Sequence, residues 1–146
     1  MKVFRFRLQT SLNVRYRQEE QQKLVLKEKI NHHEESIIEL NQILARLENN
    51  YNRIRQLQLG NLNIRELEAS NDFVIMLTAQ VEQQKLEVEY RRKEVEDARE
   101  KLLEIVKARK ILEKLKEKHF EEYRLEMLRE EQRVIDEMAA RGTRVW

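Results

Sequence analysis

The sequence contains no cysteine and no proline, and it has only two glycines among 146 residues. The absence of cysteine excludes disulfides, zinc thiolates and thiol nucleophiles. Aromatic residues make up 6% of the chain and charged residues 38%, so most positions must face water and no thick core can form. A chain rich in Glu, Lys, Arg, Leu and Gln and nearly free of helix breakers is typical of long helices. We expect such helices to bury only a narrow seam against one another.

The residues that most enzymes need are also scarce. The two glycines, Gly60 and Gly142, lie far apart, so there is no glycine-rich phosphate loop. His32 and His33 point about 100° apart on a helix and do not converge on one metal ion. No Ser, His and acidic residue occur in a context typical of a catalytic triad. We therefore expect no catalytic activity, no cofactor, no small-molecule substrate and no bound metal.

Long hydrophobic runs are missing as well. The longest apolar run, Phe73 to Leu77, is far too short to cross a bilayer. The N-terminus is basic and aromatic without the apolar segment of a signal peptide. The net charge of +2 gives no case for nucleic-acid binding. These features predict a cytoplasmic protein.

The first third of the chain carries a heptad pattern. A walk from Leu12 in alternating steps of four and three meets apolar or aromatic residues at ten of thirteen positions. A stripe this long predicts a helix that packs along one partner. The positions are Leu12, Tyr16, Glu19, Lys23, Leu26, Ile30, His33, Ile37, Leu40, Leu44, Leu47, Tyr51 and Ile54.

A second stripe follows after a break. The pattern loses phase between Gln56 and Asp72, and Ser70, Asn71 and Asp72 offer caps for a new helix. The second walk then keeps phase to Tyr123, although it is less apolar than the first. Its positions are Leu77, Val81, Gln84, Val88, Arg91, Val95, Ala98, Leu102, Ile105, Arg109, Leu112, Lys116, His119 and Tyr123.

Two in-phase stripes joined by a short break predict an all-α fold, a long antiparallel two-helix coiled coil with unequal arms. We expect a single elongated domain over 1–146, with helix 1 at about 11–57, a turn at about 58–70 and helix 2 at about 71–140. Pairing positions whose numbers sum to 128 aligns the stripes. The expected pairs are Leu26 with Leu102, Leu40 with Val88, Leu47 with Val81, Tyr51 with Leu77, and Glu19 with Arg109. Because the stripes satisfy each other within one chain, we expect a monomer.

Both ends of the sequence resemble the flagellar export protein family FliJ. The N-terminal match is Phe4-x-Phe6-x-Leu8, followed by Leu12 and Arg15. The C-terminal match comprises Glu113-Lys114-Leu115-Lys116, Tyr123, Glu131-Gln132, Ile135-Asp136-Glu137 and Ala139. The length and the two-helix plan fit that family over the whole chain.

The resemblance implies a non-enzymatic part of the bacterial type III export apparatus, peripherally associated with the inner membrane at the base of the flagellum. FliJ proteins are similar in fold to the central stalk of rotary ATPases, and their terminal end is thought to enter the hexameric export ATPase. The implied ATPase contacts are Phe4, Phe6, Leu8, Arg15, Tyr123, Glu131, Gln132, Ile135 and Asp136. For Phe4, Phe6 and Leu8 there are two interpretations, insertion into the ATPase or packing on helix 2. The resemblance also suggests escort of export chaperones.

The family further contacts the cytoplasmic domain of the export gate through a Phe-x3-Leu-x2-Ala-x3-His surface. Phe73 and Leu77 match this pattern, while Gln80 and Gln84 stand where Ala and His would. Phe73 and Leu77 could equally close the core near the turn. Two other functions compete with the export stalk. A rotary-ATPase stalk subunit usually carries a globular insertion for which the break has no room. A generic scaffold coiled coil would continue its heptads without a break.

Overall fold

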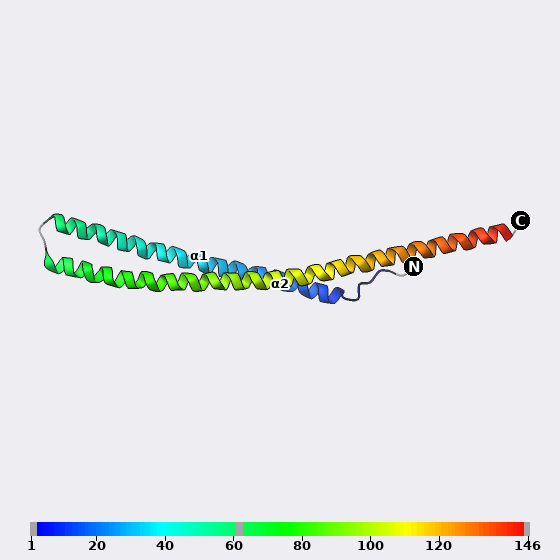
Figure 1. Ribbon diagram of the computed structural model, residues 1–146, viewed down its shortest axis with the longest axis horizontal. Helices are drawn as coiled ribbons and strands as arrows, with labels where there is room; N and C mark the ends of the chain where they lie inside the picture. The colour runs from blue at the N-terminus through cyan, green and yellow to red at the C-terminus, as the bar shows by residue number, and fades with distance from the viewer. Residues whose placement is uncertain (1–2, 61–62, 145–146) are drawn as a thin grey trace. The chain divides into compact units, whose positions relative to one another are not determined.

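The computed structural model describes residues 3–60 and 63–144, and the side chains of 143 and 144 are left aside. The described residues form two helices, α1 (Gln9–Leu59) and α2 (Ile64–Arg144), and no strand. Within the parts of the chain that pack together, α1 and α2 run in opposite directions (Figure 1). The absence of proline lets each helix continue without an interruption of its backbone hydrogen bonds. The predicted all-α antiparallel hairpin is confirmed.

Packing divides the chain into two compact units, and each is described by itself. The first unit joins the N-terminal residues up to Gln21 with α2 from Leu102 onward, and the second unit spans Gln22–Lys101. Among the described residues no helix combines the length and the apolarity that crossing a membrane requires.

α2 begins inside the segment that the sequence assigned to the turn. The Asn63 side-chain oxygen accepts a hydrogen bond from the backbone N–H of Arg65 at 3.1 Å, and Leu67 N–H donates to the Asn63 carbonyl at 3.0 Å. Asn63 therefore caps the helix. The predicted turn at 58–70 is thus too long, and the caps predicted at 70–72 are wrong. Ser70 is buried within the helix, and its carbonyl accepts a hydrogen bond from Asn50 on α1 at 2.9 Å.

The α2 side of the seam in the second unit matches the predicted stripe. Every predicted position from Leu77 to Ala98 is buried or half-buried. The centre of this unit is an apolar cluster of Ile43, Leu77 and Val81, with Leu40 and Leu47 packed against it. Such a seam is one residue deep, so burial of a few aliphatic side chains carries the apolar stabilisation.

On the α1 side of this unit every second predicted position matches, and among the alternate positions Ile30 alone is half-buried. Leu26, His33, Leu40, Leu47 and Ile54 are half-buried as predicted. The alternate positions are shifted by one residue, so that the side chains facing α2 are Ser36, Ile43 and Asn50. The predicted Ile37, Leu44 and Tyr51 lie at the edge of the seam and are 36%, 39% and 44% exposed.

Hydrogen bonds to backbone carbonyls explain this shift. Gln22 donates to the Ala98 carbonyl at 3.1 Å, Gln84 to Ser36 at 3.0 Å, and Asn50 to Ser70 at 2.9 Å. These contacts need closely spaced backbones, which the small side chains of Ser36, Ser70 and Ala98 permit. In each pair the residue numbers add up to 120 rather than 128. The predicted pairing of Tyr51 with Leu77 is wrong, because Leu77 packs against the Ile43 cluster.

In the first unit, Leu12 is almost fully buried and Phe6 is buried. All the predicted α2 positions from Leu102 to Tyr123 are half-buried. The predicted pair is present here, since Arg109 Nε lies 2.5 Å from Glu19 Oε2. Beyond Tyr123, α2 continues with every described side chain exposed except Met127, which is half-buried.

Candidate partner-binding surfaces

The predicted gate-contact residues do not share one exposed face. Phe73 is 41% exposed, whereas Leu77, one helical turn further along α2, is 1% exposed. Gln80 is exposed, and Gln84 is half-buried because its side chain crosses the seam to the Ser36 carbonyl. The structure therefore places Leu77 in the core and leaves Phe73 and Gln80 accessible beside it.

Phe73 and Gln80 line the same edge of the second unit, together with residues of α1. Phe73 borders a groove with Asn50, Arg53 and Arg46. Arg46 also lines the adjoining groove of about 580 Å³, which Gln80 and Gln84 border from α2. The α1 residues carry no sequence signal, because they follow no motif: Arg46 and Arg53 are exposed, and Asn50 is a buried polar residue of the seam. We name this edge, formed by Arg46, Asn50, Arg53, Phe73, Gln80 and Gln84, the Phe73 edge.

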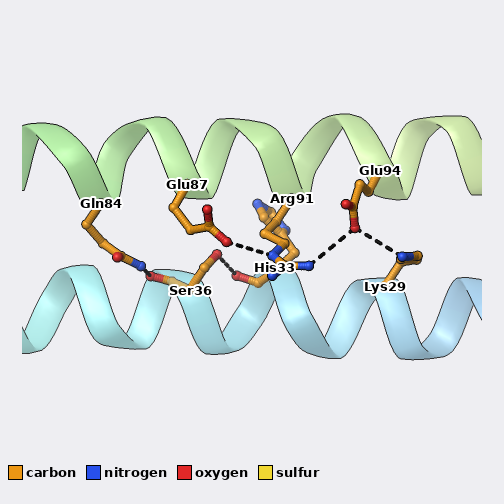
Figure 2. A network of polar contacts seen from close by, with 7 residues as sticks. All are labelled: Lys29, His33, Ser36, Gln84, Glu87, Arg91 and Glu94. Atoms are coloured by element: carbon orange, nitrogen blue, oxygen red, sulfur yellow. Dashed lines mark hydrogen bonds and ion pairs between the residues drawn. The ribbon is translucent and has the colours of Figure 1, made fainter.

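A polar network adjoins the Phe73 edge and fixes the two helices together. Figure 2 shows Gln84 reaching from α2 to the backbone of Ser36, whose hydroxyl donates to the His33 carbonyl at 2.6 Å. Arg91 contacts Glu87 at 2.8 Å and Glu94 at 3.5 Å. The Glu94 carboxylate also forms an ion pair with the Lys29 ammonium group of α1, at 3.2 Å.

The electrostatics of this network are those of partly exposed ion pairs. Hydrogen bonds from Tyr90 and Lys29 lower the pKa of Glu94, and the neighbouring carboxylates raise the pKa of Arg91, Glu87 foremost. Both shifts favour the charged forms of Glu94 and Arg91, so ion pairs help to hold the register of the two helices.

The N-terminal residues pack on α2 in the first unit. The Phe4 ring lies 5.3 Å from the ring of Phe120 and 5.5 Å from that of Tyr123. Phe6 is buried, with its ring 5.8 Å from His119 in an edge-to-face arrangement. Of the two interpretations of this segment, packing on helix 2 is the one that the geometry supports. Leu8 is half-buried, and its carbonyl accepts from Leu12 N–H at 2.9 Å.

A second polar cluster lies deeper in the same unit. Tyr16 donates its hydroxyl to Glu113 at 2.6 Å, and Arg109 contacts Glu113 at 2.8 Å as well as Glu19. The hydrogen bond from Tyr16 and then Arg109 lower the pKa of Glu113. The predicted contact residue Arg15 lies on the same turn of α1 and donates to Gln18 at 3.1 Å.

The last part of α2 presents an apolar face that no other described residue covers. Tyr123 is half-buried, while the predicted contacts Glu131, Gln132, Ile135 and Asp136 are all exposed. Gln132 donates to Asp136 at 3.0 Å. Along this stretch Met127, Glu130, Glu131, Val134 and Ile135 form a strip whose accessible surface is mostly apolar. We name these five residues the C-terminal face.

Sequence reasoning left Met127 and Val134 out of the predicted contacts, although their spacing of seven residues was the signal for them. Within the described ranges, no three His, Asp or Glu side chains gather in the way that a metal ion requires.

Comparison with known proteins identifies the chain at family level. The model of the family described as Flagellar FliJ protein matches residues 4–145, which is essentially the whole chain. No curated protein and no solved structure matches the chain significantly.

Proposed function

Because the chain belongs to the flagellar FliJ protein family, and so is a flagellar export-associated protein, we propose that it is a non-enzymatic stalk between two partners. One partner is the export ATPase hexamer and the other is the cytoplasmic domain of the export gate. In this proposal the protein works in the cytoplasm, peripherally at the membrane base of the flagellum, and its surfaces rather than a pocket carry the function.

The observation that carries the proposal is the uncovered stretch of α2 after Tyr123. In a soluble helix of this length, an apolar face normally packs against something. The C-terminal face has the width of one helix side and is bordered by Glu130 and Glu131, so it fits a partner that offers an apolar and basic lining. We assign this face to the ATPase, together with Tyr123, Gln132 and Asp136.

The gate is assigned to the Phe73 edge, which belongs to the other unit. Phe73 supplies an accessible aromatic anchor beside two arginines and an asparagine of α1. An aromatic side chain with arginines around it has the composition of an interface centre. Leu77 supports this edge from below and does not contact the partner.

Separate substitutions test the two assignments. Val134→Ser with Ile135→Ser should weaken binding to the purified ATPase hexamer at least about tenfold and leave gate binding unchanged. Phe73→Ala with Gln80→Ala should do the reverse. Ile111→Ser and Leu86→Ala are the matched controls, because both side chains are well exposed elsewhere on α2. Isothermal titration with each partner gives the affinities, and circular dichroism checks the helices.

The proposal fails if a folded variant at one surface loses both partners, or if the control substitutions weaken binding as much as the designed ones. Removal of residues 124–146 should abolish the ATPase contact and spare the gate contact.

A further inference from the structure

Two arginines on the Phe73 edge have no counter-charge. Arg46 and Arg53 lie seven residues apart on α1 and border the same groove as Phe73. The positions three and four residues before and after each arginine hold no Asp or Glu, so neither side chain can form an ion pair at helical spacing on α1. Across the described ranges, neither arginine forms an ion pair with α2. The groove therefore carries two exposed cations that are open to a partner.

Arginines elsewhere in the second unit are already paired. Arg91 lies 2.8 Å from Glu87, and Arg92 lies 2.6 Å from Glu89. A carboxylate of a partner would have to replace these existing contacts, so little is gained there. At Arg46 a partner's carboxylate forms an ion pair where none exists, and the same holds at Arg53. An acidic partner therefore gains most at this groove.

The spacing and the surroundings of the two arginines describe the ligand. Seven residues of α-helix span roughly 10 Å. The hydrogen bond from Asn50 to the Ser70 carbonyl sets the local register, and it places Phe73 between the levels of Arg46 and Arg53. The groove thus offers two cations about 10 Å apart with a 41% exposed aromatic ring between them.

We propose that this groove binds an acidic amphipathic helix of a partner protein. Two carboxylates seven residues apart on that helix meet Arg46 and Arg53, and an apolar side chain between them packs on Phe73. Residues seven apart lie on one face of a helix, and arginine can hold a carboxylate through two parallel hydrogen bonds. The inference rests on the proposed function, in which the Phe73 edge is the gate contact, and it names the chemistry of the segment that the gate presents.

Charge and symmetry argue against two other occupants. Glu66 borders the groove beside Arg53, and Glu39 borders the adjoining groove beyond Arg46, so a flat anionic membrane would meet these glutamates as well as the arginines. A single helix can contact the arginines and the ring between them alone. The C-terminal face of a second copy is also acidic and apolar, but a contact between two different surfaces of one chain is heterologous and builds rings or filaments.

Designed peptides provide the probe. The test peptide is a dye-labelled, alanine-rich helix with two glutamates seven residues apart and a leucine between them. One comparison peptide carries glutamines in place of the glutamates. The other keeps both glutamates but places them two residues apart, on different sides of the helix. In fluorescence anisotropy with the full chain, the test peptide should bind at least about tenfold more tightly than either comparison peptide.

Substitutions in the full chain then test the contacts. Arg46→Gln with Arg53→Gln should weaken the test peptide at least about tenfold and leave the glutamine peptide within about twofold. Arg55→Gln with Arg99→Gln is the matched control, because both arginines are exposed, border neither groove and change the net charge equally. Arg46→Glu with Arg53→Glu should lose the test peptide and bind a peptide with lysines at the two glutamate positions. Circular dichroism checks that the helix content is unchanged.

Four results would overturn the proposal. The three peptides bind equally well, or the control pair of substitutions weakens the test peptide as much as Arg46→Gln with Arg53→Gln. Alternatively, the chain binds vesicles containing phosphatidylglycerol through these arginines and does not bind the test peptide. Finally, sedimentation shows that the chain self-associates and that Arg46→Gln with Arg53→Gln abolishes this association.

Titration with the purified gate domain separates the inference from the function on which it rests. If Phe73→Ala with Gln80→Ala weakens gate binding while Arg46→Gln with Arg53→Gln does not, the gate uses this edge without carboxylate contacts and the inference fails alone. If neither pair of substitutions weakens gate binding, the gate assignment fails and the inference fails with it. Weakening by both pairs, with the peptide preferences above, is the expected result.

Discussion

Phe73 and Leu77 lie one turn apart on α2, and their environments differ almost completely. Leu77 is enclosed by Ile43 and Val81 and the leucines packed around them, while Phe73 borders an open groove with Asn50 and Arg53. The same apolar run thus contributes to the core at Leu77 and, in the proposed function, to partner recognition at Phe73. Burial, and not residue type, decides between these roles.

Leu77→Ala should therefore destabilise the folded protein strongly. The substitution leaves a cavity in a seam with few other apolar contacts, and we expect the free energy of unfolding to fall by about 2–5 kcal/mol. Phe73→Ala should lower it by less than about 1 kcal/mol, since the ring is already partly hydrated. Urea unfolding followed by circular dichroism measures both values. Equal losses in the two variants would show that Phe73 is part of the core.

Substitution of Arg109 tests how much the ion pair with Glu19 contributes to the stability of the first unit. Arg109→Met removes the cation from beside the buried Glu19 carboxylate, so the melting temperature should fall. Adding Glu19→Leu should recover much of the loss, because the carboxylate no longer needs a counter-charge. Thermal melts of the single and double variants give the coupling between the two residues. Additive losses would mean that the two side chains act independently.

At the scale of the helices, the sequence predicted α2 better than α1. Every predicted seam position on α2 is at least half-buried, because the seam valines at 81, 88 and 95 are each followed by a charged glutamate, so the choice between neighbouring rows is clear. On α1 the choice was between Ile43 and Leu44, which are equally apolar. Counting apolar residues favoured Leu44 and Tyr51, whereas close approach of the backbones favoured the row containing Ser36 and Asn50.

The candidate surfaces were predicted less completely than the seam. Phe73 and Ile135 could be found from family resemblance. The α1 residues beside Phe73 could not, because an arginine or asparagine on a charged helix cannot be told from the others until the fold brings it next to an aromatic ring.

The beginning of α2 provides a test of local helix structure. Asn63→Ala removes the side-chain acceptor for the Arg65 N–H, and we expect a loss of about 1 kcal/mol in unfolding free energy. Asn63→Asp retains the acceptor and places a negative charge at the helix N-terminus, so it should be neutral or slightly stabilising. Hydrogen exchange at Leu67 should accelerate only in the alanine variant. Unchanged exchange there would place the start of α2 elsewhere.

At the scale of the whole molecule, glutamates that accept hydrogen bonds from arginine or tyrosine side chains determine how the stability of the fold changes with acid pH. The pKa values of Glu89, Glu94, Glu113 and Glu121 are all lowered, mainly by hydrogen bonds from Arg92, Tyr90, Tyr16 and Arg124 respectively. A carboxylate with a lowered pKa in the folded state contributes stability that is fully present above its unfolded value, near about 4.3, and is lost as the pH falls through the folded value.

We therefore expect the melting temperature to be nearly constant from about pH 7 to about pH 5 and to fall progressively below about pH 4.5. Glu113→Gln should reduce the fall in melting temperature at acid pH, because one of the titrating carboxylates is removed. Glu117→Gln serves as a control at an exposed position of the same helix. A melting temperature that rises on acidification would contradict this account.

The chain should sediment as a monomer at micromolar concentration, because α1 and α2 already cover each other's seam residues within each unit. Sedimentation equilibrium at several concentrations measures the mass directly. A stable dimer would mean that an exposed apolar surface, such as the C-terminal face, pairs with its copy in a second chain.

The hydrogen bonds from Gln22, Gln84 and Asn50 to backbone carbonyls also bear on how such a sequence can diverge. Every residue has a carbonyl, so Ala98, Ser36 and Ser70 can be exchanged for other small residues without loss of the acceptor. The donors need only an amide of suitable length. A hairpin assembled in this way constrains side-chain size and spacing far more than identity, so its sequence can drift widely over generations while its pairing is preserved.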